Sequence, residues 1–382
     1  MTSKDNHKKH KKHARLIKPE LGEYGRNELA LIGAPCGVIQ NFADHLISRL
    51  SDRWNMAYVD ADHGSADQND AAPFKGKFNF TDKIGYHRLD ALSAPNKFER
   101  HALFNGQDII LINGNHFPGN AQIIFLHPDK KESLKRKLDR LTNVEMIIKV
   151  GDTPVFDFLS DLITDQTPVH SVDDIEAIAS WIDAWMISRA NQINGLVLAG
   201  GKSQRLGQDK TTINYHGTAH RELLARILRV RCQDTYLSCR EDQAGQIESE
   251  FPLLPDAFTG LGPYGGILSA FKKHPNHAWF VVASDLPFAL EDAIDYLLER
   301  RDPSKIATAF HNDVTDFPDP LMTIWEPKAY PVLLRFLSQG YSCPRKVLIN
   351  SDIKVVVPED QNWLTNVNTP EDLKRVEEGL KQ

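Results

Sequence analysis

Cysteine is scarce in this chain, with four in 382 residues and no two of them spaced as CxxC. They stand far apart, at Cys36, Cys232, Cys239 and Cys343. A disulfide scaffold or a zinc ribbon needs paired or clustered cysteines, so the sequence favours neither. We therefore expect free thiols in a reducing, cytoplasmic compartment. No apolar run approaches the roughly 20 residues of a membrane-spanning helix, so we expect no membrane association.

An excess of positive charge is also lacking, because the formal net charge is −6. General nucleic-acid binders are usually basic, so we expect no nucleic-acid partner. Any phosphate group has to be recognised locally, by a loop and a few cations. The chain starts with interleaved lysines and histidines, and no apolar stretch follows them, so we do not expect this segment to be a secretory signal. We expect residues 1–24 to form a disordered basic tail.

Short apolar runs alternate with helical patterns along the rest of the chain. This alternation predicts an α/β fold with mostly parallel sheets and three layers per domain. Residues 25–190 form the first predicted domain, which ends in a long helix with Ser171 as its N-cap. Within it, residues 64–98 are polar and rich in Pro, Asp and Asn, so we expect a loop. At Asn194 the pattern starts afresh, which predicts a second domain over residues 191–382.

A glycine-rich loop, LAGGKSQRLGQDK, follows the first strand of the second domain at residues 198–210. The adjacent Gly200 and Gly201 let backbone N–H groups approach an anion closely. Lys202, Arg205 and Lys210 add positive charge within the same short stretch. The loop is neither the GxGxxG fingerprint nor a complete Walker loop. Three cations beside two glycines indicate phosphate binding rather than a plain connection.

This segment resembles the signature LAGGxSxRMGxDK of the molybdenum cofactor guanylyltransferases, with Leu206 in place of the methionine. The resemblance extends over residues 191–382. It implies a Rossmann-like nucleotidyltransferase fold that transfers GMP from GTP to molybdenum–molybdopterin and releases pyrophosphate. It also implies Mg²⁺ as cofactor. As further partners it suggests proteins that insert molybdenum or mature molybdoenzymes.

The resemblance assigns roles to residues of the nucleotide side. Leu198, Ala199, Gly200 and Gly201 would line the nucleotide, and Arg205 and Lys210 would act in catalysis by neutralising the triphosphate. Asp256, which ends the strand LLPD, would contact the nucleotide. Asp285 follows the buried run WFVVAS and would hold Mg²⁺ as a catalytic residue at the carboxyl end of a strand. Its structural alternative is a turn or cap residue, which is common for Asp near proline.

On the acceptor side, the resemblance points to Arg345, Asn366 and Asn368. The family often has His before a Pro-Leu pair where this chain has Asp319. In the strand TYLSC the family often has Asn where Ser238 or Cys239 stands, so no base-reading role is assigned there.

In the first domain, the segment LIGAPCGVIQ stands where a Walker loop would be. With Gly33 aligned to the first glycine, Val38, Ile39 and Gln40 replace Gly, Lys and Ser/Thr. Nucleotide hydrolysis would lack its phosphate-binding lysine and its magnesium-binding hydroxyl, so we expect a scaffold turn. The layout is similar to the P-loop adaptor of molybdopterin-guanine dinucleotide synthesis, with DADHGS and ILINGNH at polar strand ends. This likeness implies a docking or cofactor-handling role.

Two alternatives stay open. One is the same chemistry with another substrate, as in cytidylyl- or sugar-phosphate nucleotidyltransferases. The other is a non-catalytic carrier or regulator that keeps a relic nucleotide fold. The intact Arg205, Lys210 and Asp285 argue against the second, and the choice of nucleotide discriminates the first.

Overall fold

The computed structural model describes residues 16–61, 78–200 and 217–379. The chain divides into two compact units, Glu20–Arg189 and Ala190–Gln382, and of the described residues 16–19 are also grouped with the second. The expected site residues Gly201, Arg205 and Lys210 lie outside the described residues.

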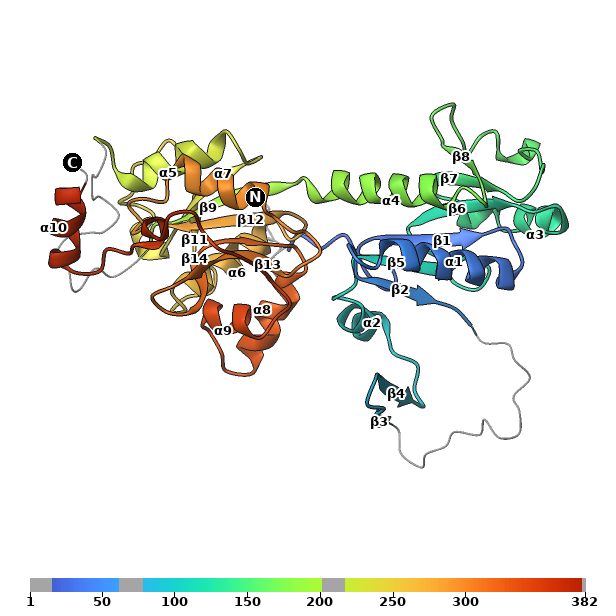
Figure 1. Cartoon of the computed structure of the whole chain (residues 1–382), viewed down its shortest axis with the longest axis horizontal. Coiled ribbons are helices and arrows are strands. Elements are labelled where there is room, and N and C mark those ends of the chain that lie inside the picture. Colours follow the sequence, from blue (N-terminus) through green and yellow to red (C-terminus); the bar gives the residue numbers. More distant parts are fainter. Residues whose placement is uncertain (1–15, 62–77, 201–216, 380–382) are drawn as a thin grey trace, which may run out of the picture. The chain divides into compact units, whose positions relative to one another are not determined.

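The first unit is built on a six-stranded sheet in the order β2-β5-β1-β6-β7-β8, with every neighbouring pair parallel (Figure 1). The central strands are continuous buried apolar runs, as expected for a parallel sheet covered on both faces. The strands of this sheet are β1 (Glu28–Ile32), β2 (Met56–Val59), β5 (Ile109–Asn113), β6 (Ala121–Leu126), β7 (Val144–Lys149) and β8 (Val169–Ser171).

Helices cover the two faces of this sheet. The helices α1 (Cys36–Leu50) and α4 (Ile175–Ala190) share one core with Leu29 and Leu111. On the opposite face, α3 (Lys131–Lys135) and short 3-10 turns share a core with Ile32 and Ile124. The 3-10 turns of this unit are Pro128–Lys130, Leu138–Arg140 and Asp157–Leu159.

The expected cap of the long helix is wrong. Ser171 ends strand β8, where it pairs with Lys149 of β7, and α4 begins only at Ile175. The backbone N–H of Ile178 donates to Asp174 O, and the Asp174 carboxylate accepts from the N–H of Ser171. Ser171 is therefore part of a strand, and the helix begins later than the local polar residues suggest.

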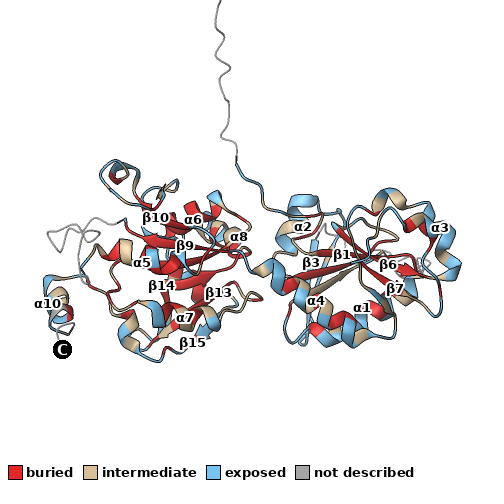
Figure 2. Cartoon of the chain, turned by 90° about the horizontal axis from the view of Figure 1, so that it is seen from above, coloured by how far each residue is buried: buried red, intermediate tan, exposed pale blue. Residues whose placement is uncertain are grey.

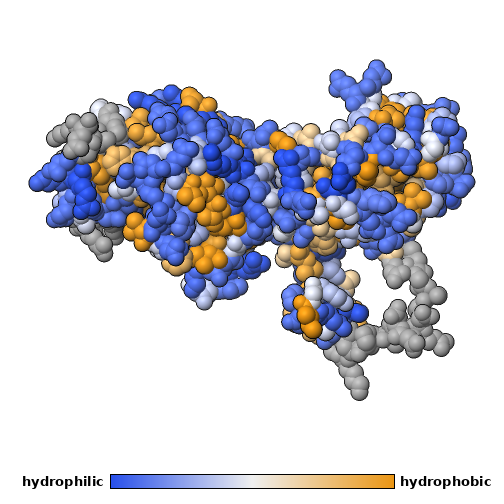
Figure 3. Space-filling model, viewed as in Figure 1, coloured by the Kyte–Doolittle hydropathy of each residue, from blue (hydrophilic) through white to orange (hydrophobic). Residues whose placement is uncertain are grey.

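The expected loop over residues 64–98 is also wrong for its described part. It contains the antiparallel hairpin β3 (Phe78–Asp82) and β4 (His87–Ala91), and α2 (Lys97–Leu103) begins at its end. Apolar side chains lie at the surface of this hairpin, among them Phe80 and Leu89 (Figure 3). Because the hairpin buries little, its composition is that of a loop. A sequence signal existed for α2, since Asn96 and Glu99 form its capping box.

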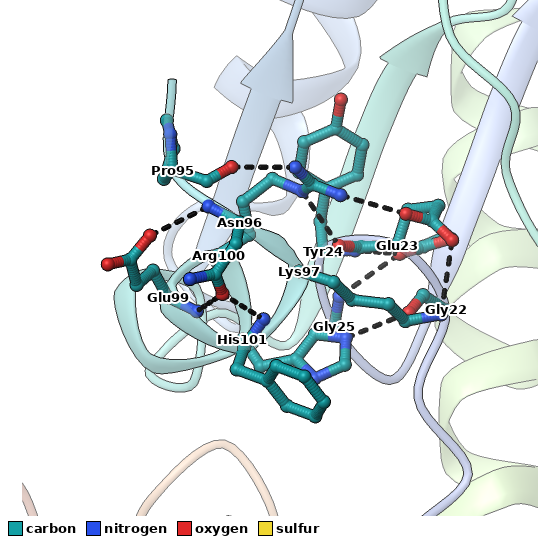
Figure 4. Close-up of polar contacts among 12 residues, drawn as sticks. Gly22, Glu23, Tyr24, Gly25, Pro95, Asn96, Lys97, Glu99, Arg100 and His101 are labelled. Carbon is teal, nitrogen blue, oxygen red and sulfur yellow. Dashed lines mark hydrogen bonds and ion pairs between the residues drawn. The ribbon is translucent and has the colours of Figure 1, made fainter. Parts of the chain in front are cut away.

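The segment before β1 is held against α2 (Figure 4). The carboxylate of Glu23 accepts from Lys97 at 3.1 Å and from Arg100 at 2.8 Å. The Arg100 guanidinium lies over the ring of Tyr24, and His101 Nε2 is 2.8 Å from Gly22 O. Residues 22–24 are thus packed, although they fall within the range that we expected to be a tail.

The second unit is built on a seven-stranded mixed sheet in the order β11-β10-β9-β12-β14-β13-β15. Figure 2 shows its strands as the buried layer of the unit. The strands are β9 (Ile193–Leu198), β10 (Thr235–Cys239), β11 (Leu253–Pro255), β12 (Ala278–Ala283), β13 (Ala307–Asn312), β14 (Phe317–Trp325) and β15 (Lys354–Val356). Only β14 runs antiparallel to its neighbours, β12 and β13.

Helices lie on both faces of this second sheet as well. Gly195 allows close packing of α5, since a Cβ there would stand 3.0 Å from the Cβ of Leu228. Leu198 faces the opposite side and meets α6 at Gly266. The helices are α5 (His220–Arg229), α6 (Pro263–Lys273), α7 (Glu291–Glu299), α8 (Ala329–Ser338), α9 (Pro344–Ile349) and α10 (Pro370–Gly379), with 3-10 turns at Glu241–Gln243 and Gln361–Leu364. The expected α/β fold class with mostly parallel sheets is confirmed.

No helix in the described ranges has both the length and the apolar character needed to cross a bilayer.

Candidate functional site

A cavity of about 440 Å³ opens at the carboxyl ends of β9, β10 and β11. Ser238 stands opposite Leu198 on one side and opposite Leu254 on the other, so the three strands end side by side. Of the expected nucleotide-binding residues, Leu198, Gly200 and Asp256 line this cavity. The rest of its described lining is Ser238, Arg240, Glu241, Asp242, Thr259, Gly260, Gly262 and Pro263.

Glycines of α6 and of the turn before it let this helix pack closely behind the cavity lining. A Cβ on Gly266 would come within 2.6 Å of Ser238 Oγ and 3.0 Å of the Leu198 side chain. At the mouth, Gly262 has φ +57°, and Pro263 starts α6 directly after it. The N-terminus of this helix, which is the positive end of its dipole, therefore lies at the cavity. This arrangement suits a ligand with negative charge.

Asp256 lies at the cavity directly after β11. Its backbone N–H donates to Cys239 O at 2.9 Å, and its Oδ1 accepts from the Ser238 hydroxyl at 3.1 Å. Burial raises the pKa of Asp256 to about 6, although the Ser238 hydrogen bond and the charge of Arg240 act in the other direction. Near neutral pH the group is a carboxylate that accepts hydrogen bonds in a partly dry pocket.

This raised pKa predicts how stability depends on pH. The folded pKa of Asp256 lies above the unfolded value of about 4, so its contribution to stability is present below that value and is lost as pH rises through about 6. Asp256→Asn does not ionise. The melting temperature of this variant, relative to that of the native chain, should therefore rise between about pH 4 and about pH 6. Above about pH 6 the difference between the two should stay constant. Asp292→Asn, in the exposed first turn of α7 and outside the described cavity lining, serves as control; a constant offset for Asp256→Asn across that range would contradict the raised pKa.

Asp285 lies two residues beyond β12, the strand next to β9 on the side away from β10. The preceding Ser284 donates to Leu198 O through both its N–H, at 3.2 Å, and its hydroxyl, at 3.0 Å. His220 Nε2 is 2.9 Å from Leu286 O on the other side. The turn that carries Asp285 is therefore fixed to the end of β9. Asp285 itself is not among the described residues that line the cavity.

The closing segment reaches the same turn. The N–H of Val367 donates to Asp285 O at 2.9 Å, so Asn366 and Asn368 flank a residue bonded to the turn. Asn366 Oδ1 is buried and has no hydrogen-bond partner within the described ranges. Three residues assigned from widely separated motifs are thus brought together: Asp285, Asn366 and Asn368.

Arg345 is the second residue of α9 and acts on the buried Asp319. Asp319 accepts from Asn312 Nδ2 at 3.1 Å and from the N–H of Leu321 at 2.8 Å. Burial raises the pKa of Asp319, while these hydrogen bonds and the Arg345 charge lower it. In the described part of the chain, Arg345 Nε is buried without a hydrogen-bond partner. A buried donor of this kind is a candidate for contact with a ligand.

Asp285 can hold a divalent cation only if the substrate supplies further ligands to the same ion. Within the described ranges, no group of three or more His, Cys, Asp or Glu side chains is arranged to hold a metal ion. Mg²⁺ is commonly held by one or two carboxylates, with substrate phosphates and waters completing its shell. One carboxylate at a strand end, in a turn bonded to the end of β9, meets that requirement.

Sequence reasoning missed several residues of the cavity, of which Arg240 is the most polar. It follows β10 and forms two hydrogen bonds with the Asp242 carboxylate, both at 2.8 Å. Ser238 had been left without a role. A signal existed for both, because ligands of open α/β sheets bind at the carboxyl ends of adjacent strands. What the sequence could not supply was the adjacency of β10 and β9.

In the first unit, the Walker-like position is a scaffold turn by its geometry. Gly33 has φ +103°, and a Cβ there would meet Phe125 O at 2.4 Å. Ile39, at the lysine position, is fully buried in the core beneath α1. Val38 is half-buried and Gln40 is exposed, both within the helix. The residue that would bind phosphate in a Walker loop instead holds α1 to its sheet.

Comparison with known proteins relates the second unit to one family. Residues 195–354 match the model of the MobA-like NTP transferase domain. A molybdenum cofactor biosynthesis bifunctional protein of Synechocystis is 32% identical over 183 residues, which are 48% of this chain and 53% of that protein. The chain thus spans about half the length of this relative.

Two further matches cover nearly all of the protein compared. A molybdenum cofactor guanylyltransferase of Pseudomonas putida is 27% identical over 192 residues, covering 47% of this chain and 94% of the relative. The crystal structure of molybdopterin-guanine dinucleotide biosynthesis protein A from Archaeoglobus fulgidus matches with 25% identity and a TM-score of 0.42, covering 49% of this chain and 98% of that one. Residues 195–354 therefore form a MobA-like NTP transferase domain, and the C-terminal half of the chain carries a nucleotidyltransferase.

Proposed function

We propose that the second unit transfers GMP from GTP to molybdenum–molybdopterin, which yields the guanine dinucleotide cofactor and pyrophosphate. The observation that carries this proposal is the cavity at the ends of β9, β10 and β11, where the glycine loop begins at Gly200. The names of the relatives from Synechocystis and Pseudomonas putida point to the same pathway.

The cavity itself would bind the nucleoside part of GTP. Asp256, held by Ser238, offers carboxylate oxygens as hydrogen-bond acceptors. Guanine carries two adjacent N–H donor groups on one edge, whereas cytosine carries one amino group, so an accepting carboxylate favours guanine. Leu198 supplies apolar contact, and Gly200 lets the nucleotide approach the backbone.

The chemical step would be in-line attack by a phosphate oxygen of the acceptor on the α-phosphorus of GTP. The new P–O bond forms as the bond to the β-phosphate breaks, and pyrophosphate leaves. Catalysis of such a step rests on positioning and on neutralising charge. Arg205 and Lys210, with the amides of the glycine loop, would bind the triphosphate. An acceptor phosphate that is already ionised needs no general base.

Asp285 would hold the divalent cation, which we propose to be Mg²⁺. When bound, the cation supplies charge stabilisation to the α-phosphate and the departing pyrophosphate. Arg345, Asn366 and Asn368 would contact the acceptor. The buried Nε of Arg345 and Oδ1 of Asn366 support this role, because both need a partner.

For the first unit we propose a non-hydrolytic part in the same process, through docking or handling of the cofactor. Residues 25–190 would then be a degenerate P-loop-like domain. The core position of Ile39 supports the absence of nucleotide hydrolysis. Proteins that insert molybdenum or mature molybdoenzymes would be its partners, and the cytoplasm its compartment.

Nucleotide choice tests the proposal against a cytidylyl- or sugar-phosphate-transferring alternative. The full chain, Mg²⁺ and molybdenum–molybdopterin are incubated with GTP, CTP or ATP in separate reactions, and pyrophosphate is measured. We expect release with GTP at a rate at least about tenfold above that with CTP or ATP, which corresponds to about 1.4 kcal/mol of discrimination. Faster release with CTP would assign the domain to the cytidylyl branch, and release with none would favour a carrier.

A further inference from the structure

A cysteine, a histidine and an aspartate meet in the first unit, at the position of the degenerate Walker loop. Cys36 is the first residue of α1, Asp60 directly follows β2, and His116 lies just beyond β5. Cys36 Sγ is 3.2 Å from His116 Nε2, and the same nitrogen is 3.8 Å from Asp60 Oδ1. Since β1, β5 and β2 are neighbours in the sheet, three carboxyl ends bring these side chains together.

Asp60 is fixed as an anion beside the histidine. Its Oδ2 accepts from the Tyr58 hydroxyl and its Oδ1 from the N–H of Ala61, both at 2.7 Å. Burial alone would raise the pKa of Asp60, but hydrogen bonds from Tyr58, Asn113 and Ala61 outweigh it, and the pKa is lowered. Burial raises the pKa of Tyr58, which therefore remains a neutral donor. The carboxylate is thus available to stabilise an imidazolium.

Positive charge borders the other side of the cysteine. Asn115 Nδ2 donates to Ala34 O at 2.8 Å and lies 3.9 Å from Cys36 Sγ, while Lys137 Nζ donates to Asn115 O at 3.1 Å. Burial lowers the pKa of Lys137, and so do the nearby positive charges of Arg140, Lys130 and Arg136. Among the residues that the structure describes, which leave out 62–77, the charged or titratable groups that face Cys36 are Tyr58, Asp60, His116 and Lys137.

This arrangement suits thiol activation better than metal binding. The described residues contain no group of three side chains arranged as metal ligands. A thiol at a helix N-terminus beside a histidine is the recurring environment of reactive cysteines. His116 Nε2 is placed to accept the thiol proton, and Asp60 is placed to stabilise the positive charge that results. The thiolate left on Cys36 is stabilised by the N-terminus of the 15-residue helix α1.

We propose that Cys36 is a nucleophilic thiolate that exchanges with anionic organic disulfides. Cys36 Sγ attacks one sulfur of the disulfide, a Cys36–sulfur bond forms, the original S–S bond breaks, and the released thiolate takes the proton from His116. The positive charge of Lys137, with Arg140 nearby, favours a disulfide that carries negative charge. Cys36 is the only cysteine within residues 20–189, so within this unit the exchange ends at a mixed disulfide. The proposal is independent of nucleotidyl transfer.

The chain contains its own reference thiol. Cys343 is also exposed, whereas Cys232 and Cys239 are buried. Burial raises the pKa of Cys232 to about 12 and that of Cys239 to about 11, so neither competes as a thiolate. The full-length native protein is treated with oxidised glutathione, an anionic disulfide, or with cystamine, a cationic one. Mixed disulfides at Cys36 and Cys343 are then quantified by peptide mass analysis.

At about pH 6.5 an ordinary thiol is about 1% ionised, while an activated one is largely ionised but intrinsically less nucleophilic. The two effects leave Cys36 reacting about fivefold or more faster than Cys343 with oxidised glutathione. His116→Gln should abolish this advantage, and His45→Gln, on the exposed face of the same helix, should keep it. Lys137→Gln should reduce the preference for oxidised glutathione over cystamine.

A readout on the native chain does not depend on any variant folding. At about pH 6.5, Cys36 should be alkylated by iodoacetamide, a neutral reagent, about fivefold or more faster than Cys343. Lys137→Gln should leave this rate within about twofold of the native one while it changes disulfide preference. Equal rates of alkylation of Cys36 and Cys343, or equal reaction of both with oxidised glutathione, would overturn the proposal.

Discussion

Replacing Asp285 with asparagine is expected to lower the single-turnover rate of GMP transfer about a thousandfold, with little change in melting temperature. A loss of about 4 kcal/mol of transition-state stabilisation corresponds to that factor. Asparagine keeps the size of the side chain but lacks the charge that anchors a hard divalent cation. The backbone contact from Val367 to Asp285 O, and those of Ser284 and Leu286 on either side, do not depend on the carboxylate and should survive.

A purely structural role for Asp285 predicts the opposite result for the same variant. If Asp285 only stabilises its turn, the substitution costs about 1 kcal/mol of stability and leaves the chemistry near normal. Asp292→Asn, in the exposed first turn of α7, is the matched control for removal of a nearby carboxylate. Rates measured at saturating Mg²⁺ and GTP separate the two readings. A near-native rate for Asp285→Asn would remove it from the active site.

Arg345→Met should raise the KM for molybdenum–molybdopterin about 10- to 100-fold and leave the Kd for GTP within about twofold. Hydrogen bonds that involve a charged group contribute about 1.5–3 kcal/mol, which gives this range. Methionine retains much of the apolar stem and removes the guanidinium, whose Nε is buried without a partner among the described residues. Steady-state kinetics with the acceptor varied, together with GTP titration, measure the two effects separately.

Loss of Arg345 also leaves Asp319 buried without its nearby charge, so folding has to be checked. The double variant Arg345→Met/Asp319→Asn removes that unpaired charge and should recover stability without recovering the acceptor KM. Arg335→Met, on the exposed side of α8, is the control for charge. An unchanged KM in Arg345→Met, or an equal loss of GTP affinity, would contradict an acceptor role.

Local patterns in the sequence predicted much of the fold. The buried runs that became β1, β5, β6 and β12 are long and apolar because both faces of each sheet are covered. The hairpin β3–β4 escaped notice because its strands are short and its few apolar side chains, such as Phe80 and Leu89, are exposed, so no continuous buried run marks it in the sequence. Ser171 was misread as a cap because strand pairing, which is not local, determines its conformation.

The candidate sites were predictable only where a motif carried them. Asp256 and Gly200 were found through the resemblance of their segments to family motifs, and the structure brings them to one cavity. Arg240 was missed because its role depends on β10 lying beside β9. The approach of His116 to Cys36 joins residues 80 positions apart, and no spacing in the sequence indicates it. Contacts across adjacent strand ends follow from sheet order, which a single sequence does not contain.

Product analysis tests the central claim most directly. The full chain is incubated with GTP, Mg²⁺ and molybdenum–molybdopterin, and the pterin fraction is analysed by mass. Our account predicts a new species heavier than the acceptor by one GMP unit, formed together with an equal amount of pyrophosphate and absent when Asp285→Asn replaces the native chain over the same interval. Unchanged acceptor, or a CMP-bearing product that forms in preference when CTP competes with GTP, would contradict it.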